Sequence, residues 1–294
     1  MSANTHDQSQ QRFRRYLEEL GAGVASGRGF FEPGSVFWRV AREPALLVAG
    51  IRALLMQVAH PKVAQGVADH SRYRDDPLGR GIRTFSAVYA MVFGVREQAV
   101  AAALKVHGIH CRVQGRVQDP LPADMDPAYA ANDPELLLWV AATLLDSSVV
   151  AYELFVEPLS GAEKEALYQD SKLFGQLFGV PKALYPDSWD DFQRWMDDAY
   201  SADRLVVTGT ARDICDSLFN GTWFTRLLGP ANYVAAAMLL PDVLGEAYGF
   251  RRSSTVRLSF RALTALVRTL TRLVPRRWRG VPAARRMERR LLKS

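Results

Sequence analysis

The sequence predicts an all-α protein, with one helical domain of about ten helices (35–250) between a polar N-terminal arm (1–34) and a basic C-terminal extension (251–294). Prolines and helix-capping residues recur along the chain, whereas no run of alternating apolar and polar residues indicates a strand, and no Asn-Gly or Asp-Gly hairpin turn lies between β-branched runs. Among 294 residues, 48% are hydrophobic and 23% charged, which is a globular composition with ample material for one core.

The first half of the central domain is divided into helices by proline and glycine. Pro44, Pro61 and Pro77 each stand where a helix can begin, because proline fits the first helical turn. Gly94 and Gly115 each stand where a helix can end. The predicted helices span residues 44–59, 61–70, 77–94 and 95–114.

The second half carries three capping signals. Asp133 precedes Pro134, Ser160 begins the capping box Ser-Gly-Ala-Glu, and Ser188 opens Ser-Trp-Asp-Asp. These signals predict helices over 134–157, over 161–179 and from 189 onward.

The N-terminus lacks the apolar core of a signal peptide, and the longest uncharged apolar run, 136–145, is shorter than a membrane span. Two cysteines suit a reducing compartment. These features predict a protein that stays in the cytoplasm.

The charge is distributed unevenly. Residues 251–294 hold 13 arginines, one lysine and one acid, a net charge of +13, so that the remaining 250 residues carry −7. A basic tail favours an anionic partner. We favour the inner face of a membrane over nucleic acid, because few aromatic residues are interleaved with the arginines and the rest of the chain is acidic.

Part of this tail forms an amphipathic pattern. Four arginines gather on one side of a helical wheel, opposite an apolar arc. For 255–274, two interpretations stay open: a helix in a membrane interface, or a terminal helix docked on the core. For 276–294 we favour the anionic surface. The arginines are Arg257, Arg261, Arg268 and Arg272; the arc comprises Val256, Phe260, Leu263, Leu266, Val267, Leu270, Leu273 and Val274.

Four of the five histidines lie between residues 60 and 110. At 100° per residue, His110 falls within the apolar stripe of the 95–114 helix and His107 at its edge. A neutral imidazole in apolar surroundings suits an axial haem ligand, although a hydrogen-bonded core histidine is the commoner outcome of this pattern. A non-haem metal site from His60, His70 and His107 with a carboxylate is a further alternative, and capping explains His60, which precedes Pro61, equally well.

Polar residues on two other predicted helices are also candidates. Arg80 and Thr84 share a face, where they could hold a propionate or polarise bound oxygen; the alternative is an ion pair with Asp75 or Asp76. Asp146 lies on the apolar 134–157 helix, where burial would raise its pKa and suit a general base. The alternative, contacts to neighbouring helices, is favoured. No dinucleotide fingerprint, Walker loop or nucleophile elbow is present.

Three segments together resemble a known family: LLMQVAHPKVAQGVADHSRYRDDPLGRGIRTFSAVYAMVFG, VHGIHCRVQG and YAANDPELLLWVAATLLDSSVVAYELFVEPLS. They resemble the oxygenase family of MpaB and the latex-clearing proteins (rubber oxygenases), over roughly residues 35–245. The resemblance implies an all-α fold with a globin-like core around haem b. Its known members cleave carbon–carbon double bonds of isoprenoid chains with dioxygen, so it implies a hydrophobic substrate as well.

The resemblance also assigns residues. It places the proximal haem ligand at His110, beside His107, and the family's arginine and threonine at Arg80 and Thr84. Two positions depart from the pattern. The lysine next to the threonine is an arginine here, and no acid stands in register with the glutamate base proposed for the rubber-cleaving members. Asp69, with His70 beside it, is the nearest candidate base and Asp146 the next. That departure leaves a non-catalytic or sensor haem- or lipid-binding protein as an alternative to an oxygenase.

Overall fold

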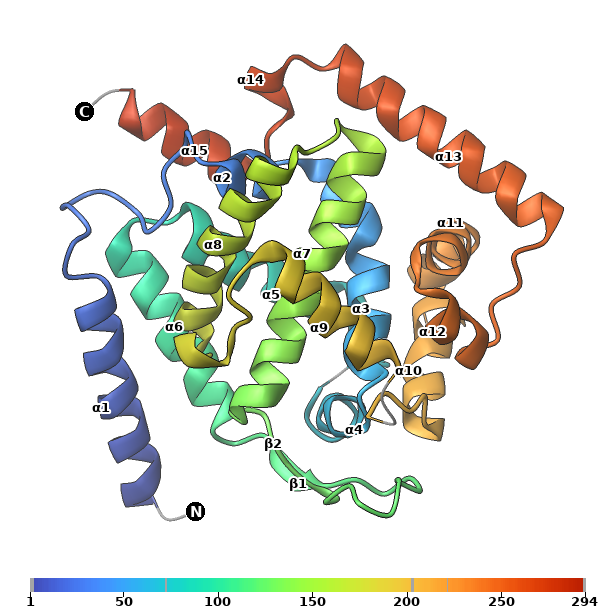
Figure 1. The fold of residues 1–294 in the computed structure, drawn as a ribbon, viewed down its shortest axis with the longest axis horizontal. Helices are drawn as coiled ribbons and strands as arrows, with labels where there is room; N and C mark the ends of the chain where they lie inside the picture. Colours follow the sequence, from blue (N-terminus) through green and yellow to red (C-terminus); the bar gives the residue numbers. More distant parts are fainter. Residues whose placement is uncertain (1–2, 72, 202–203, 221, 293–294) are drawn as a thin grey trace.

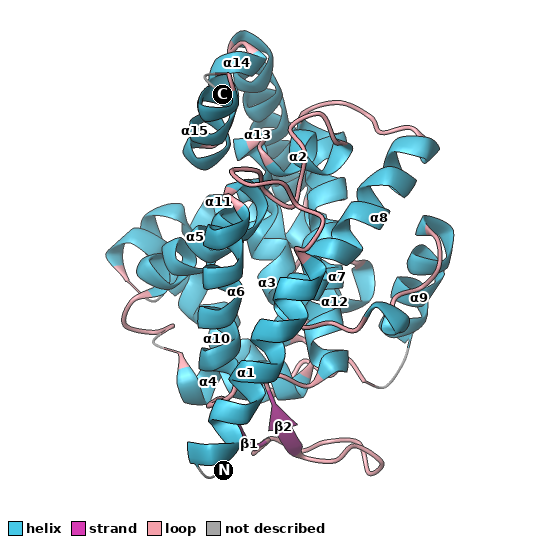
Figure 2. Cartoon of the chain, turned by 90° about the vertical axis from the view of Figure 1, so that its left-hand side faces the viewer, coloured by secondary structure: helices cyan, strands magenta, loops and turns pink. Residues whose placement is uncertain are grey.

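The computed structural model describes residues 3–71, 73–201, 204–220 and 222–292, and it confirms the all-α prediction. The helices enclose a core of apolar side chains, and a two-stranded sheet lies at one end of the molecule (Figures 1 and 2). The elements are α1 (Ala3–Leu20), α2 (Val36–Ala41), the 3₁₀ helix η1 (Pro44–Ala49), α3 (Gly50–Val58), α4 (Pro61–His70), α5 (Pro77–Phe93), α6 (Arg96–His110), β1 (Gln114–Arg116), β2 (Ala128–Ala130), α7 (Pro134–Phe155), α8 (Gly161–Phe178), the 3₁₀ helix η2 (Lys182–Leu184), α9 (Trp189–Ser201), α10 (Gly209–Asn220), α11 (Trp223–Leu239), α12 (Asp242–Ala247), α13 (Ser254–Leu273), α14 (Arg276–Arg279) and α15 (Pro282–Leu291).

Helix α7 runs through the centre of the molecule and packs on η1, α3 and α8 (Figure 1). The Asp133 side chain caps it by accepting a hydrogen bond from the Glu135 amide at 2.9 Å, as the sequence predicts. The sequence predicts no membrane-spanning segment, because its longest uncharged apolar run is short. By length and mean hydropathy, however, α7 could cross a membrane, and so could residues 44–58 and 61–70 taken together as one bent helix pair. Two thirds of the most apolar 18-residue stretch of α7 is buried inside the protein, which is typical of a core helix.

The predicted capping signals of the second half are confirmed. Ser160 and Glu163 cap each other's backbone amides at the start of α8, and Gly179 ends that helix in the left-handed conformation with φ of 97°. The Asp191 amide donates to the Ser188 hydroxyl at the start of α9. Local signals of this kind depend on neighbouring residues alone, so the sequence is sufficient to locate them.

Two predicted helices differ from the structure. Residues 44–59 form the 3₁₀ helix η1 followed by α3, because the small buried side chains of Ala45 and Ala49 let this tight segment pack on α7. The helix predicted to reach residue 114 ends at His110. The following residues form β1, which pairs antiparallel with β2 so that Gly115 lies opposite Tyr129. A Cβ at position 115 would lie 2.7 Å from Tyr129 Oη, so this glycine permits a strand contact rather than ending a helix.

The two ends of the chain pack on the outside of the central domain. Helix α1, within the predicted arm, packs on α6 through the buried Phe13 and Leu17. Helices α13, α14 and α15 lie along one side of the molecule (Figures 1 and 2). Helix α15 packs on α5, and Glu288 receives hydrogen bonds from Trp38 and Arg42.

Candidate functional site

Helices α5 and α6 are consecutive, pack on each other and carry four of the predicted site residues, Arg80, Thr84, His107 and His110. Only Gly94 and Val95 separate the two helices in the sequence. Arg80 is in the first turn of α5, and His110 is the last residue of α6.

The His110 side chain is largely buried, and its Nδ1 atom has no hydrogen-bond partner among the described residues. Burial, with a smaller contribution from the charge of His107, lowers the pKa of His110 to about 4. The imidazole is therefore neutral near pH 7. A neutral, buried imidazole with an unused ring nitrogen can donate a lone pair to a metal.

His107 is in contact with α1. Its Nε2 is hydrogen-bonded to Ser9 Oγ at 3.2 Å, and its ring stacks on Phe13 with centroids 4.2 Å apart. These contacts give His107 a packing role beside His110. The apolar stripe predicted on the 95–114 helix includes Ile109 and Val113 beside His110. It is only partly present, because Ile109 is exposed and Val113 lies beyond the end of the helix.

Arg80 is a partly buried guanidinium, and no described carboxylate forms an ion pair with it. Burial, and to a lesser extent the charge of Arg83, lowers the pKa of Arg80 below its ordinary value. The sequence allows an ion pair between Arg80 and Asp75 or Asp76 as an alternative role. In the structure Asp76 pairs with Arg83 instead, at 2.9 Å. Thr84, one turn after Arg80, is exposed. Arg80 is therefore available to bind an anionic group.

The end of α4 reaches the same region. Gly66 lies against Val113 and Tyr129, with contacts to the position of a Cβ of 3.6 and 3.5 Å. Asp69 accepts hydrogen bonds from Tyr129 Oη at 2.6 Å and Gln65 Nε2 at 2.8 Å. Burial, followed by the hydrogen bond to Asp69, raises the pKa of Tyr129, so the phenol stays protonated and donates.

His70 ends α4 with its ring exposed, edge-on to Tyr129 at 6.4 Å. Asp69 is exposed as well. Both candidate bases can therefore exchange protons with water at the end of α4, near the residues that follow His110.

Asp146 is held by a different group of helices. Its carboxylate pairs with Arg52 of α3 at 2.6 Å, and both side chains are buried. Arg52 also donates to Ser147 Oγ and to the Leu239 carbonyl of α11, each at 2.7 Å. These contacts match the favoured sequence interpretation, in which Asp146 binds neighbouring helices.

The residues of the predicted non-haem site are not gathered together. His60 Nδ1 accepts the Lys62 amide at 3.3 Å as the N-cap of α4, and burial lowers its pKa to about 4. Within the described ranges, no three histidine, cysteine, aspartate or glutamate side chains form a group that could hold a metal ion.

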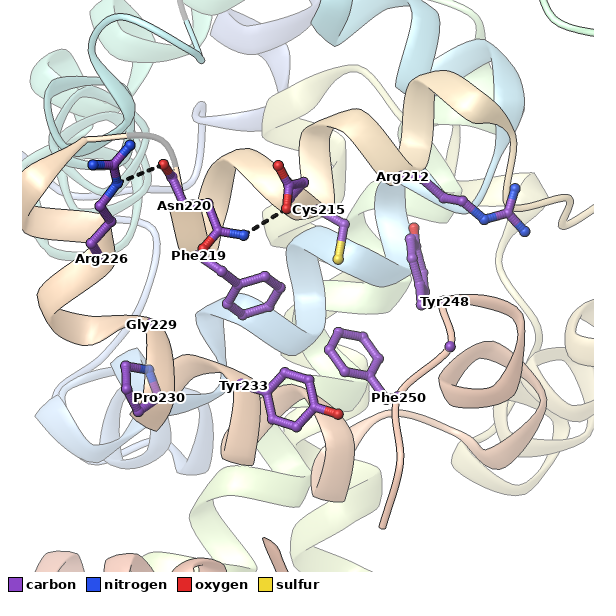
Figure 3. Close-up of a pocket in the computed structure, with 12 residues that line it drawn as sticks. Arg212, Cys215, Phe219, Asn220, Arg226, Gly229, Pro230, Tyr233, Tyr248 and Phe250 are labelled. Atoms are coloured by element: carbon purple, nitrogen blue, oxygen red, sulfur yellow. Dashed lines mark hydrogen bonds between the residues drawn. The ribbon is translucent and has the colours of Figure 1, made fainter. Parts of the chain in front are cut away.

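A cavity of about 560 Å³ lies elsewhere, between α10, α11 and the segment after α12 (Figure 3). Phe219, Tyr233 and Phe250 pack edge to face in its wall, while Arg212 and Arg226 stand at opposite ends of the view. None of the site residues predicted from the sequence lines this cavity. Its aromatic wall suits an apolar ligand.

Several residues that support the site were not predicted. Tyr129 and Gln65 hold Asp69, whereas Ser9 and Phe13 hold His107. The spacing of Phe13 and Leu17, four residues apart in a polar segment, is a signal that α1 packs on the core. No signal in the sequence links Asp69 to Tyr129, because that contact depends on the β1–β2 pairing.

Comparison with known proteins identifies the family. Residues 38–269 match the family model described as ER-bound oxygenase mpaB/B'/Rubber oxygenase, catalytic domain, which extends beyond the predicted 35–245 into α13. The chain is 26% identical over 231 residues to the uncharacterized proteins Mb2261 of Mycobacterium bovis and Rv2237 of Mycobacterium tuberculosis, covering 76% of this chain and 88% of each relative. No solved structure matches. Since the match spans most of the chain, the protein belongs to the mpaB/rubber oxygenase catalytic-domain family.

Proposed function

We propose that the protein is a haem b-dependent oxygenase that acts on a hydrophobic, isoprenoid or lipid-like substrate, by oxidative cleavage of a carbon–carbon double bond. The family match supports an oxygenase that uses dioxygen. The observation that carries the cofactor proposal is His110, the last residue of α6, whose Nδ1 atom is buried and has no hydrogen-bond partner among the described residues.

The residues present fit a haem group. His110 would hold the haem iron, because its low pKa keeps the imidazole unprotonated over the physiological range. Arg80 would bind a propionate, since its guanidinium is partly buried and free of carboxylates among the described residues. Thr84, on the same helix face, would contribute a hydroxyl. His107, fixed by Ser9 and Phe13, would keep α6 in place beside the ligand.

Bound haem iron would supply the activation of dioxygen. The chain's own contribution at the end of α4 is proton handling. Tyr129 donates to Asp69, which orients the carboxylate, and His70 stands next to it in the chain. We propose Asp69 and His70 as the first candidate bases. Asp146 ranks after them, because its carboxylate already pairs with Arg52.

Oxygen consumption by the haem-loaded protein tests this function. A panel of prenyl alcohols and long-chain isoprenoid alkenes should stimulate oxygen uptake and yield carbonyl products, whereas the saturated analogues should not. Asp69→Asn should lower the turnover number by about tenfold or more, because a positioned general base contributes at least that much. Asp198→Asn, which alters an exposed carboxylate of α9, is the matched control. Stable haem binding without substrate-dependent oxygen uptake would contradict the enzyme and favour the sensor alternative.

A further inference from the structure

Helix α13 is only half covered by the rest of the molecule. One side packs on α11 and α7, and Val267 contacts the small cluster formed by Ala45, Ala49, Ala151 and Phe155. The side chain of Thr271 is buried on the same side. The apolar arc predicted from the sequence is therefore divided: its inner half docks on the core, as one of the two interpretations expects.

The outer half of that arc is exposed. Leu266, Leu270 and Leu273 are 57%, 54% and 73% exposed, and at 100° per residue they fall within an arc of about 60°. Beyond the end of the helix, Trp278 of α14 is 62% exposed. Exposed leucines in a continuous row mark an interaction surface more often than solitary ones do.

Arginines stand at the opposite edge of the exposed arc, roughly half a turn around the helix from the leucine row. The side chains of Arg257, Arg261, Arg268 and Arg272 are exposed, and no carboxylate in the described part of the chain pairs with them. Other arginines of the extension bind the body instead, as in the Arg276–Glu157 and Arg279–Glu43 pairs at 2.7 and 2.6 Å. The structure thus separates arginines that anchor the extension from four that face outward, roughly half a turn around the helix from the leucine row.

We propose that this outer face of α13, with Trp278, docks on an anionic lipid surface. Leucines on one flank would enter the interface, while the arginines on the other would contact lipid phosphates. The charge distribution also sets the orientation, because the extension carries +13 and the remainder of the chain −7. An anionic membrane would therefore attract this side and repel the rest. This inference is independent of haem binding and of the reaction.

The leucine row favours a lipid surface over nucleic acid, which would use the arginines without the leucines. The flanking arginines favour it over a second copy of this chain, because four like charges would face each other across a two-fold interface. The membrane would be one with anionic lipid on the accessible leaflet, such as the cytoplasmic leaflet.

Vesicle co-sedimentation of the full chain tests the proposal. Vesicles of phosphatidylcholine with about a third phosphatidylglycerol are compared with pure phosphatidylcholine, at low and high salt. One variant combines Leu266→Gln, Leu270→Gln and Leu273→Gln; another combines Arg261→Gln, Arg268→Gln and Arg272→Gln. The matched controls are Leu184→Gln with Val243→Gln, and Arg12→Gln with Arg14→Gln and Arg15→Gln, all exposed and away from this face. Circular dichroism verifies that each variant is folded.

We expect binding to the anionic vesicles, weakened by salt, and at least about tenfold weaker binding to pure phosphatidylcholine. The leucine variant should lower the partition coefficient by about tenfold or more. The arginine variant should lower it by about a hundredfold, since each surface arginine contributes about fivefold. Each control should stay within about twofold of wild type.

Absence of vesicle binding by the wild type would overturn the proposal, as would equal loss in variants and controls. So would two other results. A dimer that the leucine variant dissociates, without vesicle binding, would assign the face to a second copy. Salt-dependent binding to DNA that needs the arginines but not the leucines would assign it to nucleic acid.

Discussion

His60 and His110 are both largely buried, and each has a pKa lowered to about 4, yet only one has its Nδ1 lone pair in use. His60 accepts the Lys62 amide at the start of α4, whereas His110 Nδ1 has no partner among the described residues. A buried polar atom without a partner costs stability unless a ligand or water satisfies it. That difference distinguishes the structural histidine from the candidate ligand.

The folding stability should respond to the titration of His60. Its folded pKa lies below the ordinary value of 6.5, so the unfolded chain takes up this proton first as the pH falls. Between about pH 6.5 and 4 the folded state therefore loses on the order of 3 kcal/mol of stability through this residue. His60→Asn keeps a capping acceptor and removes the titration. Urea unfolding at several pH values should show a shallower decline for the variant; parallel declines would contradict the assignment.

Arg52 should be essential to stability because it neutralises the buried Asp146 carboxylate. Arg52→Met leaves that charge unpaired and should lower the free energy of unfolding by about 3–5 kcal/mol. Adding Asp146→Leu should restore much of the loss. Arg194→Met, which removes an exposed pair with Asp191, should cost less than about 1 kcal/mol. Chemical denaturation measures all three; a double variant no more stable than Arg52→Met would contradict the account.

At the scale of elements, α1 is an integral helix that supports α6. Leu17 is fully buried, and Phe13 stacks on His107. Leu17→Ala should therefore lower the free energy of unfolding by about 2–5 kcal/mol through lost burial and the cavity that remains. Glu18→Ala, an exposed change one residue along, should lie within about 0.5 kcal/mol of wild type. Equal stability of the two variants in urea would show that α1 does not pack as described.

The elements also show what the sequence can and cannot predict. The starts of α4, α5, α7 and α8 are predicted correctly, because proline and capping side chains act within one turn. The end of α6 is not, because residues 114–116 leave the helix to pair with 128–130, a contact remote in sequence. The same pairing brings Tyr129 to Asp69. The sequence was therefore sufficient to name Asp69 as a candidate base, but not to predict its hydrogen bond with Tyr129.

At the scale of the whole molecule, two separate regions carry the two proposals: the candidate haem site and the outer face of α13. Helix α6 ends at His110, and the residues that follow it lie beside α4, which carries Asp69. Helix α13 presents leucines and arginines along one side. A protein that docks on a membrane through this face of α13 would have access to hydrophobic substrates dissolved in the membrane. The two proposals fail independently, since one is measured by vesicle binding and the other by haem spectra.

The central claim, that His110 holds haem, is tested most directly by the absorption spectrum of the purified, haem-supplemented protein. Wild type should show a Soret band at about 400 nm. His110→Ala should lose that band while its far-ultraviolet circular dichroism is unchanged, and His70→Ala, altered at an exposed ring, should retain it. Full haem retention with an unchanged spectrum in His110→Ala would contradict the ligand assignment, and a wild type without a Soret band would contradict haem dependence itself.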